Sequence, residues 1–249
     1  MTKTTKKNRI AAILLTLAMT LGVFSAFGVT NASAATDKVS LYSSNITFTK
    51  YGARTYEVFI QTRDNAYNQE VYVHYNYMDS LGWSDAKAEY VTTLNDGSKI
   101  WKAYFSSFNT KYAIKFVADG REYWDNNNGN DYNGTETIGT APIAPERIGS
   151  GFAYSNTYKV NAVLQNYAYN KNVFVRYTTD NWKTYKDQAL SYNCTKADGT
   201  ELWDTVICAP YGTSINEEFH YAICYQVNGT EYWANNFGAN YDISYYIHH

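Results

Sequence analysis

The chain repeats itself, and this repeat constrains the fold more than any other feature. Three blocks return in the same order, the first two at an offset of 102 residues and the third at 109: AYNQEVYVHY (66–75) returns as AYNKNVFVRY (168–177), DGSKIW (96–101) as DGTELW (198–203), and REYWDNNNGNDY (121–132) as TEYWANNFGANY (230–241). Matching blocks in a fixed order predict two homologous units of about a hundred residues, each a normal size for one domain.

The repeat places these units at residues 38–139 and 151–249. Two of the three prolines, Pro142 and Pro145, lie in the stretch TAPIAPERIGS between them. Proline restricts the backbone, so we expect residues 140–150 to form a short, semi-rigid linker.

Residues 1–34 have the pattern of a secretory signal peptide. Four basic residues precede the uncharged apolar run 10–29, and Ala32, Ser33 and Ala34 supply small residues for cleavage. A run of this length could instead anchor the chain in a membrane, but the small-residue site and the polar sequence after it favour cleavage. We therefore expect a secreted, extracellular protein.

The apolar residues of both units alternate with a period of two. Val71, Val73 and Tyr75 are separated by single polar or aromatic residues, and Gly, Asn and Asp clusters interrupt such runs at short intervals. No window shows a 3.6-residue apolar stripe. The predicted fold class is all-β, with two tandem Ig-like antiparallel β-sandwich domains.

Composition narrows the class of ligand. Residues 38–249 carry more acidic than basic side chains and contain no basic patch, which argues against nucleic acid. The 26 Tyr outnumber the 11 Phe, although a buried Tyr hydroxyl needs a partner. We therefore expect part of the Tyr surplus on the surface, where aromatic faces can meet a polar ligand.

The three cysteines are Cys194, Cys208 and Cys224. An odd number in a secreted chain leaves at least one thiol unpaired. One disulfide is possible, but the sequence does not indicate which two cysteines would form it. None has metal-ligand spacing. Cys208 and Cys224 lie in apolar alternating runs, so we expect both to be buried.

Each unit carries three Trp. Trp101 and Trp203 start alternating runs, which predicts packing against the core. Trp83 and Trp182 lie in polar, turn-like stretches, SLGWSD and TTDNWKT. Trp124 and Trp233 open the Asn-rich loops.

The Asn-rich loops suggest a neutral sugar as ligand. An aromatic ring can cover the apolar face of a pyranose, and side-chain amides can bond its hydroxyls. Two other interpretations stay open: a structural Asn-Gly turn with buried aromatics beside it, or a Ca²⁺ loop. The loop lacks the Asp alternation and distal Glu of common Ca²⁺ loops, and we expect neither a metal nor another cofactor.

Each unit contains three features in the same order: VHYNYMDSLGW or VRYTTDNWKTY, a later Trp, and YWDNNNGNDY or YWANNFGANY. Together they resemble the starch-binding modules of carbohydrate-binding family 21. The resemblance covers both units. It implies an Ig-like sandwich that binds α-1,4-glucans and does no chemistry.

The resemblance implies two sets of binding residues. Those of the first site are Trp83, Trp124, Asn126 and Asp131 in the first unit and Trp182, Trp233, Asn235 and Asn240 in the second. A second family site implies Tyr67 and Tyr169. The chain departs from some members at Ala113 and Ala222, where they carry Tyr, and its second unit has Ala234 and Phe237 in place of Asp125 and Asn128.

An enzyme is not expected. No acid pair repeats in both units, no G-x-S-x-G motif is present, and two module-sized units leave no room for a catalytic domain. The sequence therefore predicts a secreted, non-catalytic, monomeric binder of starch, amylose, amylopectin, glycogen or maltooligosaccharides. Association with a separate amylase or with the cell surface stays open. The alternative is an adhesion or assembly protein whose Tyr-rich surface binds another protein or a different glycan.

Overall fold

A computed structural model describes residues 38–48, 52–78, 80–134, 138–146, 151–154, 157–209 and 218–242. The predicted signal peptide, residues 1–34, lies outside these ranges. The described part of the chain contains no helix with the length and apolar character that a membrane span requires.

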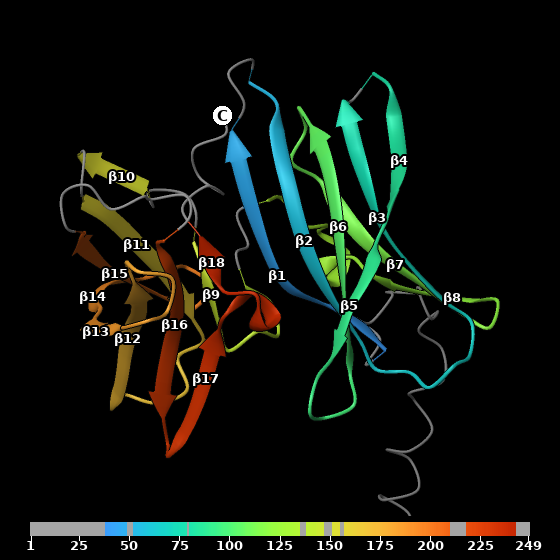
Figure 1. The fold of residues 1–249 in the computed structure, drawn as a ribbon. Coiled ribbons are helices and arrows are strands. Elements are labelled where there is room, and N and C mark those ends of the chain that lie inside the picture. The colour runs from blue at the N-terminus through green and yellow to red at the C-terminus, as the bar shows by residue number, and fades with distance from the viewer. Residues whose placement is uncertain are drawn as a thin grey trace, which may run out of the picture. The chain divides into compact units, whose positions relative to one another are not determined.

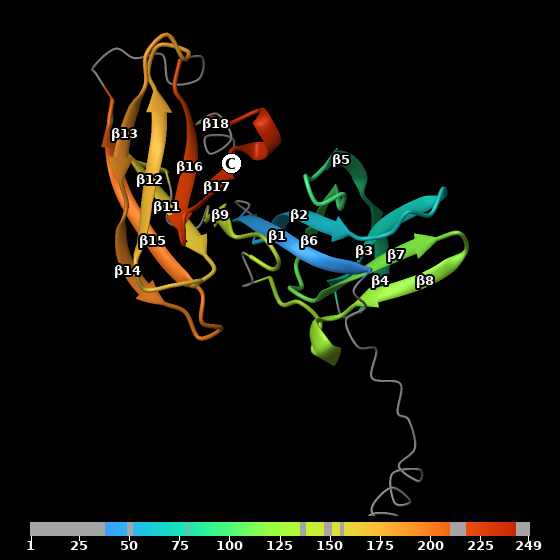
Figure 2. The same ribbon diagram turned by 90° about the horizontal axis from the view of Figure 1, so that it is seen from below.

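The first unit consists of two four-stranded antiparallel sheets (Figures 1 and 2). Its strands are β1 (Val39–Phe48), β2 (Arg54–Thr62), β3 (Gln69–Met78), β4 (Gly82–Lys87), β5 (Glu89–Thr93), β6 (Lys99–Ser107), β7 (Tyr112–Ala118) and β8 (Arg121–Asp125). One sheet has the order β1-β2-β6-β5 and the other β4-β3-β7-β8. The 3₁₀ turn η1 (Asn127–Gly129) follows β8.

The second unit repeats this arrangement. Its strands are β9 (Ile143–Pro145), β10 (Gly151–Tyr154), β11 (Thr157–Leu164), β12 (Lys171–Thr178), β13 (Lys186–Ala189), β14 (Ser191–Thr195), β15 (Glu201–Cys208), β16 (His220–Val227), β17 (Thr230–Ala234) and β18 (Tyr241–Asp242). One sheet has the order β10-β11-β15-β14 and the other β13-β12-β16-β17, while β9 pairs with β11 and β18 with β16. The turn η2 (Asn236–Gly238) follows β17.

Each unit has its own core, because alternate side chains of the strands point inward. In the first unit Val71, Val73 and Ile114 are fully buried between the sheets, and in the second Val175 and Ile223 hold the same positions. The two Ig-like β-sandwiches confirm the predicted fold class. Trp101 and Trp203 pack against the edges of these cores, as predicted.

The stretch predicted as a linker contains a strand. Residues Ile143 to Pro145 form β9 and pair in antiparallel register with Ala162 to Leu164 of β11. Among the described strands β9 pairs with β11 alone, so Pro145 lies on an edge strand, where a missing N–H is tolerated. The domain boundaries themselves stay a prediction.

The expectation for the cysteines was half wrong. All three are free thiols; Cys224 is buried, but Cys208 is exposed, as is Cys194. Ile207 points into the core, so Cys208, the next residue and the last of β15, points outward.

A buried carboxylate ties the Asn-rich loop of the first unit to its first strand. Asp125, 3% exposed, accepts hydrogen bonds from the backbone N–H of Leu41 at 2.9 Å and the Tyr132 hydroxyl at 2.6 Å. The bond to Leu41 links residues 84 positions apart. In the second unit Ala234 takes the place of Asp125, so that unit lacks this carboxylate.

We predict that Asp125→Ala destabilises the first unit by about 2–3 kcal/mol, because it leaves a buried N–H and a buried hydroxyl without their charged acceptor. Urea denaturation would measure the loss, and amide hydrogen exchange would assign it to residues 38–134. Glu122→Ala, an exposed change on the same strand, serves as the control and should stay near the parent. Equal stability of the two variants would contradict this role of Asp125.

Candidate functional site

The outer face of the β4-β3-β7-β8 sheet brings two tryptophans of the first unit together around a histidine. Trp83 lies on β4 and is 41% exposed, and Trp124 lies on β8 and is half-buried. His74 of β3 lies between them, stacked on Trp83 with ring centroids 4.9 Å apart and planes 9° apart. It meets Trp124 edge-on at 5.5 Å. One face of Trp83 is therefore covered by the imidazole.

Charged side chains of neighbouring strands hold this group in place. The Asp85 carboxylate lies 2.6 Å from His74 Nδ1 and also accepts a hydrogen bond from Lys115. Burial raises the pKa of Asp85, but the hydrogen bonds from Lys115 and His74 outweigh burial and leave its pKa below the ordinary value. The Lys115 ammonium lies 5.7 Å from the centroid of Trp124, so cation and ring attract each other.

The second unit builds the same face with an arginine at the centre. The Arg176 guanidinium lies 4.4 Å from the ring centroid of Tyr185 and 5.3 Å from that of Trp233. Two 2.7 Å hydrogen bonds join Arg176 to Asp187. These bonds raise the pKa of Arg176 and lower that of Asp187.

The two units do not place their first-site Trp residues alike. Its polar neighbours predicted a turn for Trp83, but it lies in strand β4. This strand is at the edge of its sheet and largely exposed, so it tolerates polar residues. Trp182 lies on the loop between β12 and β13 with a left-handed φ of 63°. At the offset of 102 that the repeat defines, the counterpart of Trp83 is Tyr185, which is 58% exposed.

Sequence reasoning therefore missed Tyr185, His74 and Arg176. The offset of 102 could have identified Tyr185, but the stretch TTDNWKT resembles the family's binding loop and therefore favoured Trp182. His74 lies in an alternating strand-like stretch, and nothing in the sequence distinguishes an outward strand position from a binding position. Ala113 and Ala222, where some family members carry Tyr, are the register partners of His74 and Arg176 on β7 and β16.

The Asn side chains of both loops close their own turns. Asn126 Oδ1 accepts a hydrogen bond from the Gly129 N–H at 3.0 Å, and Asn235 Oδ1 accepts one from Gly238 at 3.2 Å. Such caps satisfy the free N–H groups of a helical turn. The amide nitrogen of each Asn is the group with donors to offer a ligand.

The backbone of the last predicted residue of each loop is held by an Asn four residues earlier in the chain. Asn127 donates from Nδ2 to the Asp131 carbonyl, and Asn236 to the Asn240 carbonyl, both at 3.2 Å. Asp131 and Asn240 have left-handed φ values of 57° and 61°, which Asp and Asn tolerate better than most residues. Each loop is thus a structural Asn-Gly turn, as one of the alternative interpretations predicted. The turn also fixes the direction of the two side chains predicted to bind, the first Asn and the last Asp or Asn.

Tyr67 and Tyr169, predicted for the second site, lie away from secondary structure on the β2–β3 and β11–β12 connections. They are 95% and 97% exposed, the highest values among the large hydrophobic residues of the described ranges. The structure thus presents both rings to solvent.

A known family model covers most of the second unit. Residues 156–244 match the model of the carbohydrate/starch-binding module, family 21. That segment is a family 21 module.

Curated relatives match only part of this chain. Glycogen-binding subunit 76A of Drosophila melanogaster is 30% identical over 78 residues, which are 31% of this chain and 12% of the relative. Protein phosphatase 1 regulatory subunit 3B of Rattus norvegicus is 36% identical over 95 residues, 37% of this chain and 32% of the relative. The chain therefore spans a third or less of the length of these relatives.

A solved structure of the starch-binding domain of Rhizopus oryzae glucoamylase, in complex with β-cyclodextrin and maltoheptaose, is 24% identical. The alignment covers 43% of this chain and 97% of the domain, with a TM-score of 0.32.

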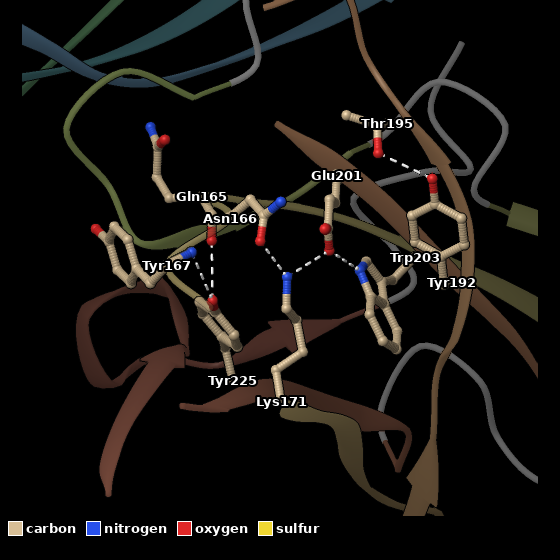
Figure 3. A network of polar contacts seen from close by, with 9 residues as sticks. All are labelled: Gln165, Asn166, Tyr167, Lys171, Tyr192, Thr195, Glu201, Trp203 and Tyr225. Carbon is tan, nitrogen blue, oxygen red and sulfur yellow. Dashed lines mark hydrogen bonds and ion pairs between the residues drawn. The ribbon is translucent and has the colours of Figure 1, made fainter. Parts of the chain in front are cut away.

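In the family 21 module a buried ion pair supports the loop that carries Tyr169 (Figure 3). Lys171 Nζ lies 2.8 Å from Glu201 Oε2, and their side chains are 3% and 9% exposed. Lys171 also donates to Asn166 at 2.6 Å, and Trp203 Nε1 donates to Glu201 at 2.9 Å. In the same view, the hydroxyl of Tyr225 donates to the Gln165 carbonyl at the start of the loop.

The first unit replaces this ion pair with neutral contacts. Gln69 stands at the position of Lys171, and its amide donates to the carbonyls of Asp64 and Ala66 at 2.9 Å. Trp101 Nε1 donates to the Thr62 hydroxyl. Lys99 takes the position of Glu201.

A second set of side-chain bonds orders the loop that carries Trp182. The hydroxyl of Thr178 accepts the Trp182 N–H at 2.9 Å, and Asp180 accepts the backbone N–H and hydroxyl of Thr184. The bond from the Thr184 N–H, joined by those from the Thr184 and Thr178 hydroxyls, lowers the pKa of Asp180 to about 2.

We predict that Glu201→Ala destabilises the family 21 module by about 3–5 kcal/mol, because it leaves the Lys171 ammonium buried without its partner. Urea denaturation would measure this loss. The paired change Lys171→Gln with Glu201→Gln, which removes both charges, is the control and should cost clearly less. The prediction fails if Glu201→Ala alone costs under about 1 kcal/mol.

We also predict that the Trp182 loop keeps its order at pH 4 and loosens only as the pH falls towards 2. A carboxyl whose folded-state pKa lies below its ordinary 3.8 stabilises the fold above that value, and this contribution is lost as the pH falls through about 2. Hydrogen exchange of the Thr184 amide would report the change, with the Leu190 amide, bonded to the Val173 carbonyl, as control. Loss of Thr184 protection already between pH 5 and 4 would contradict it.

Proposed function

We propose that the protein is a secreted, non-catalytic α-glucan-binding protein in which both units act as starch-binding modules. The observation that carries the proposal is the outer sheet face that is built twice, with an aromatic ring on either side of a basic side chain, His74 or Arg176, and an Asn-rich loop after β8 or β17. Residues 156–244 are a carbohydrate-binding module by family, and the first unit repeats their blocks and strand order.

The aromatic rings supply the stacking surface. In the first unit Trp83 and Trp124 present indole faces to glucose. In the second unit Tyr185 and Trp233 take this role, and Trp182 adds a further ring from the loop between β12 and β13. A glucose ring offers C–H groups to such a face while its hydroxyls stay at the rim. Because His74 covers one side of Trp83, the sugar stacks on the other side.

The Asn-rich loops supply hydrogen bonds to the glucose hydroxyls. Asn126 and Asn235 donate from their side-chain amide nitrogens, since their oxygens close the turns. Asp131 accepts in the first unit, and Asn240 both donates and accepts in the second. Tyr67 and Tyr169 form the second contact of each unit with the polymer.

Two linked modules explain the duplication. Single sites of this kind bind with micromolar to millimolar Kd, or about −8 to −4 kcal/mol. When one module is bound to a polymer, the other rebinds at high effective concentration, and avidity rises without new contacts. Such a chain would retain α-glucans such as starch, amylose, amylopectin, glycogen or maltooligosaccharides outside the cell, for a separate amylase or at the cell surface.

We predict that Trp124→Ala and Trp233→Ala each weaken binding to insoluble starch by at least about tenfold, and that the double variant no longer binds. A pull-down on starch, with cellulose as control polymer and maltoheptaose as competitor, would measure this. Tyr104→Ala removes a ring that is 52% exposed on the other sheet and should bind as the parent does.

Unchanged binding by the double variant would exclude the stacking mechanism. Failure of the parent chain to bind starch would exclude the function, and the search would then turn to a protein partner of the Tyr-rich surface. Binding to cellulose in place of starch would indicate another glycan.

A further inference from the structure

The position between the aromatic rings differs chemically between the two units. His74 occupies it in the first unit and Arg176 in the second, at the offset of 102 that relates the β3 and β12 strands. Both side chains contact an aromatic ring on each side and an aspartate on the edge strand. Arginine keeps its charge at every physiological pH, whereas histidine changes charge between pH 5 and 8.

Contacts fix the imidazole as a support for Trp83. Its ring lies parallel to the indole, and Nδ1 is held by Asp85 at 2.6 Å. The His74 and Asp85 side chains are about one-third exposed, so solvent reaches the ring while it stays stacked. A protonated ring adds a cation–π attraction to Trp83 and an ion pair to Asp85, and both hold the indole in one orientation.

Charged side chains of four strands surround His74 on the outer face. The charged and titratable side chains on the outer face of these strands are Asp85 and Lys87 from β4, Lys115 from β7, Glu122 from β8, and Glu70 and Tyr72 from β3 itself. Lys87 lies 2.8 Å from Glu70, and Lys115 bonds Asp85, so each lysine is paired with a carboxylate. β7 places Ala113 directly beside His74, and β8 contributes the neutral edge of Trp124. Asp85 is thus the charge in direct contact with the imidazole.

We infer that His74 is a positioning residue that makes glucan binding by the first unit stronger when it is protonated, while Arg176 keeps the second unit in the equivalent state at every pH. This inference rests on the proposed function and adds a pH response to one of its two sites. An exposed cation–π contact corresponds to a two- to fivefold change in affinity, roughly, between the charged and the neutral ring.

Variants of the full chain allow glucan binding by each unit to be measured separately. Trp233→Ala leaves binding to the first unit and Trp124→Ala leaves it to the second. Titration calorimetry with maltoheptaose between pH 5 and 8 would give Kd for each. We expect the Trp233→Ala chain to lose affinity about two- to fivefold from pH 5 to pH 8, and the Trp124→Ala chain to keep one Kd throughout.

A reciprocal exchange of the two residues tests the cause. His74→Arg in the Trp233→Ala chain should abolish the pH dependence, and Arg176→His in the Trp124→Ala chain should introduce it. A merely structural role for His74 would not produce this exchange. His220→Gln, on β16 of the second unit, is the control histidine and should leave both profiles unchanged. Thermal unfolding of every variant checks folding, and if His74→Arg fails to fold, Arg176→His decides.

The outcomes separate the two proposals. Binding with the same Kd at pH 5 and 8 in the Trp233→Ala chain, tighter binding at pH 8, or a pH dependence that survives His74→Arg would overturn the role of His74 alone. Absence of maltoheptaose binding in both chains at every pH would overturn the proposed function, and the inference with it.

Discussion

The pleat of the β-strands is the constraint on which both units depend. Alternate residues of β3 and β7 build the core, so the residues between them are left to line an outer face. On that face, strands that are distant in sequence bring rings and charges into contact range. His74, Trp83 and Trp124 come from three strands, and only the register of the sheet places them together. The same pleat therefore determines both the stability of each unit and the composition of its display surface.

The outer faces of both units pair a basic side chain with an aspartate, but they use different residues to do so. The first unit has Lys115 on β7 and the titratable His74 on β3, both bonded to Asp85. The second has Arg176 on β12 and, where Lys115 would be, Cys224. The thiol is covered by its neighbours, and burial, joined by the nearby Glu231 carboxylate, raises its pKa to about 12. The permanent cation therefore stands on β7 in the first unit and on β12, the counterpart of β3, in the second, where Cys224 is a small neutral side chain at the position of Lys115.

The sequence allowed the fold to be predicted well because its signals are local or repeated. Period-two alternation and turn clusters are properties of neighbouring residues, and the repeat confirms each of them a second time. Side-chain partners such as Asp85 for His74 are not local in this sense, since they depend on register across strands. Cys208 shows the same limit: alternation predicts a strand, but only the register decides that Ile207 points inward and Cys208 outward. The counterpart of Trp83 in the second unit shows this limit as well. The local motif around Trp182 resembles the family loop, whereas the constant offset between the strands identifies Tyr185.

The buried pair of Lys171 and Glu201 affects how the two copies can exchange sequence. Repeats within one gene recombine with each other, and a crossover between the two positions would join Lys171 to Lys99, or Gln69 to Glu201. Either hybrid would bury a charge without its partner, and an unpaired buried charge is strongly destabilising. The ion pair thus penalises mixing of the two copies and preserves the differences between their surfaces.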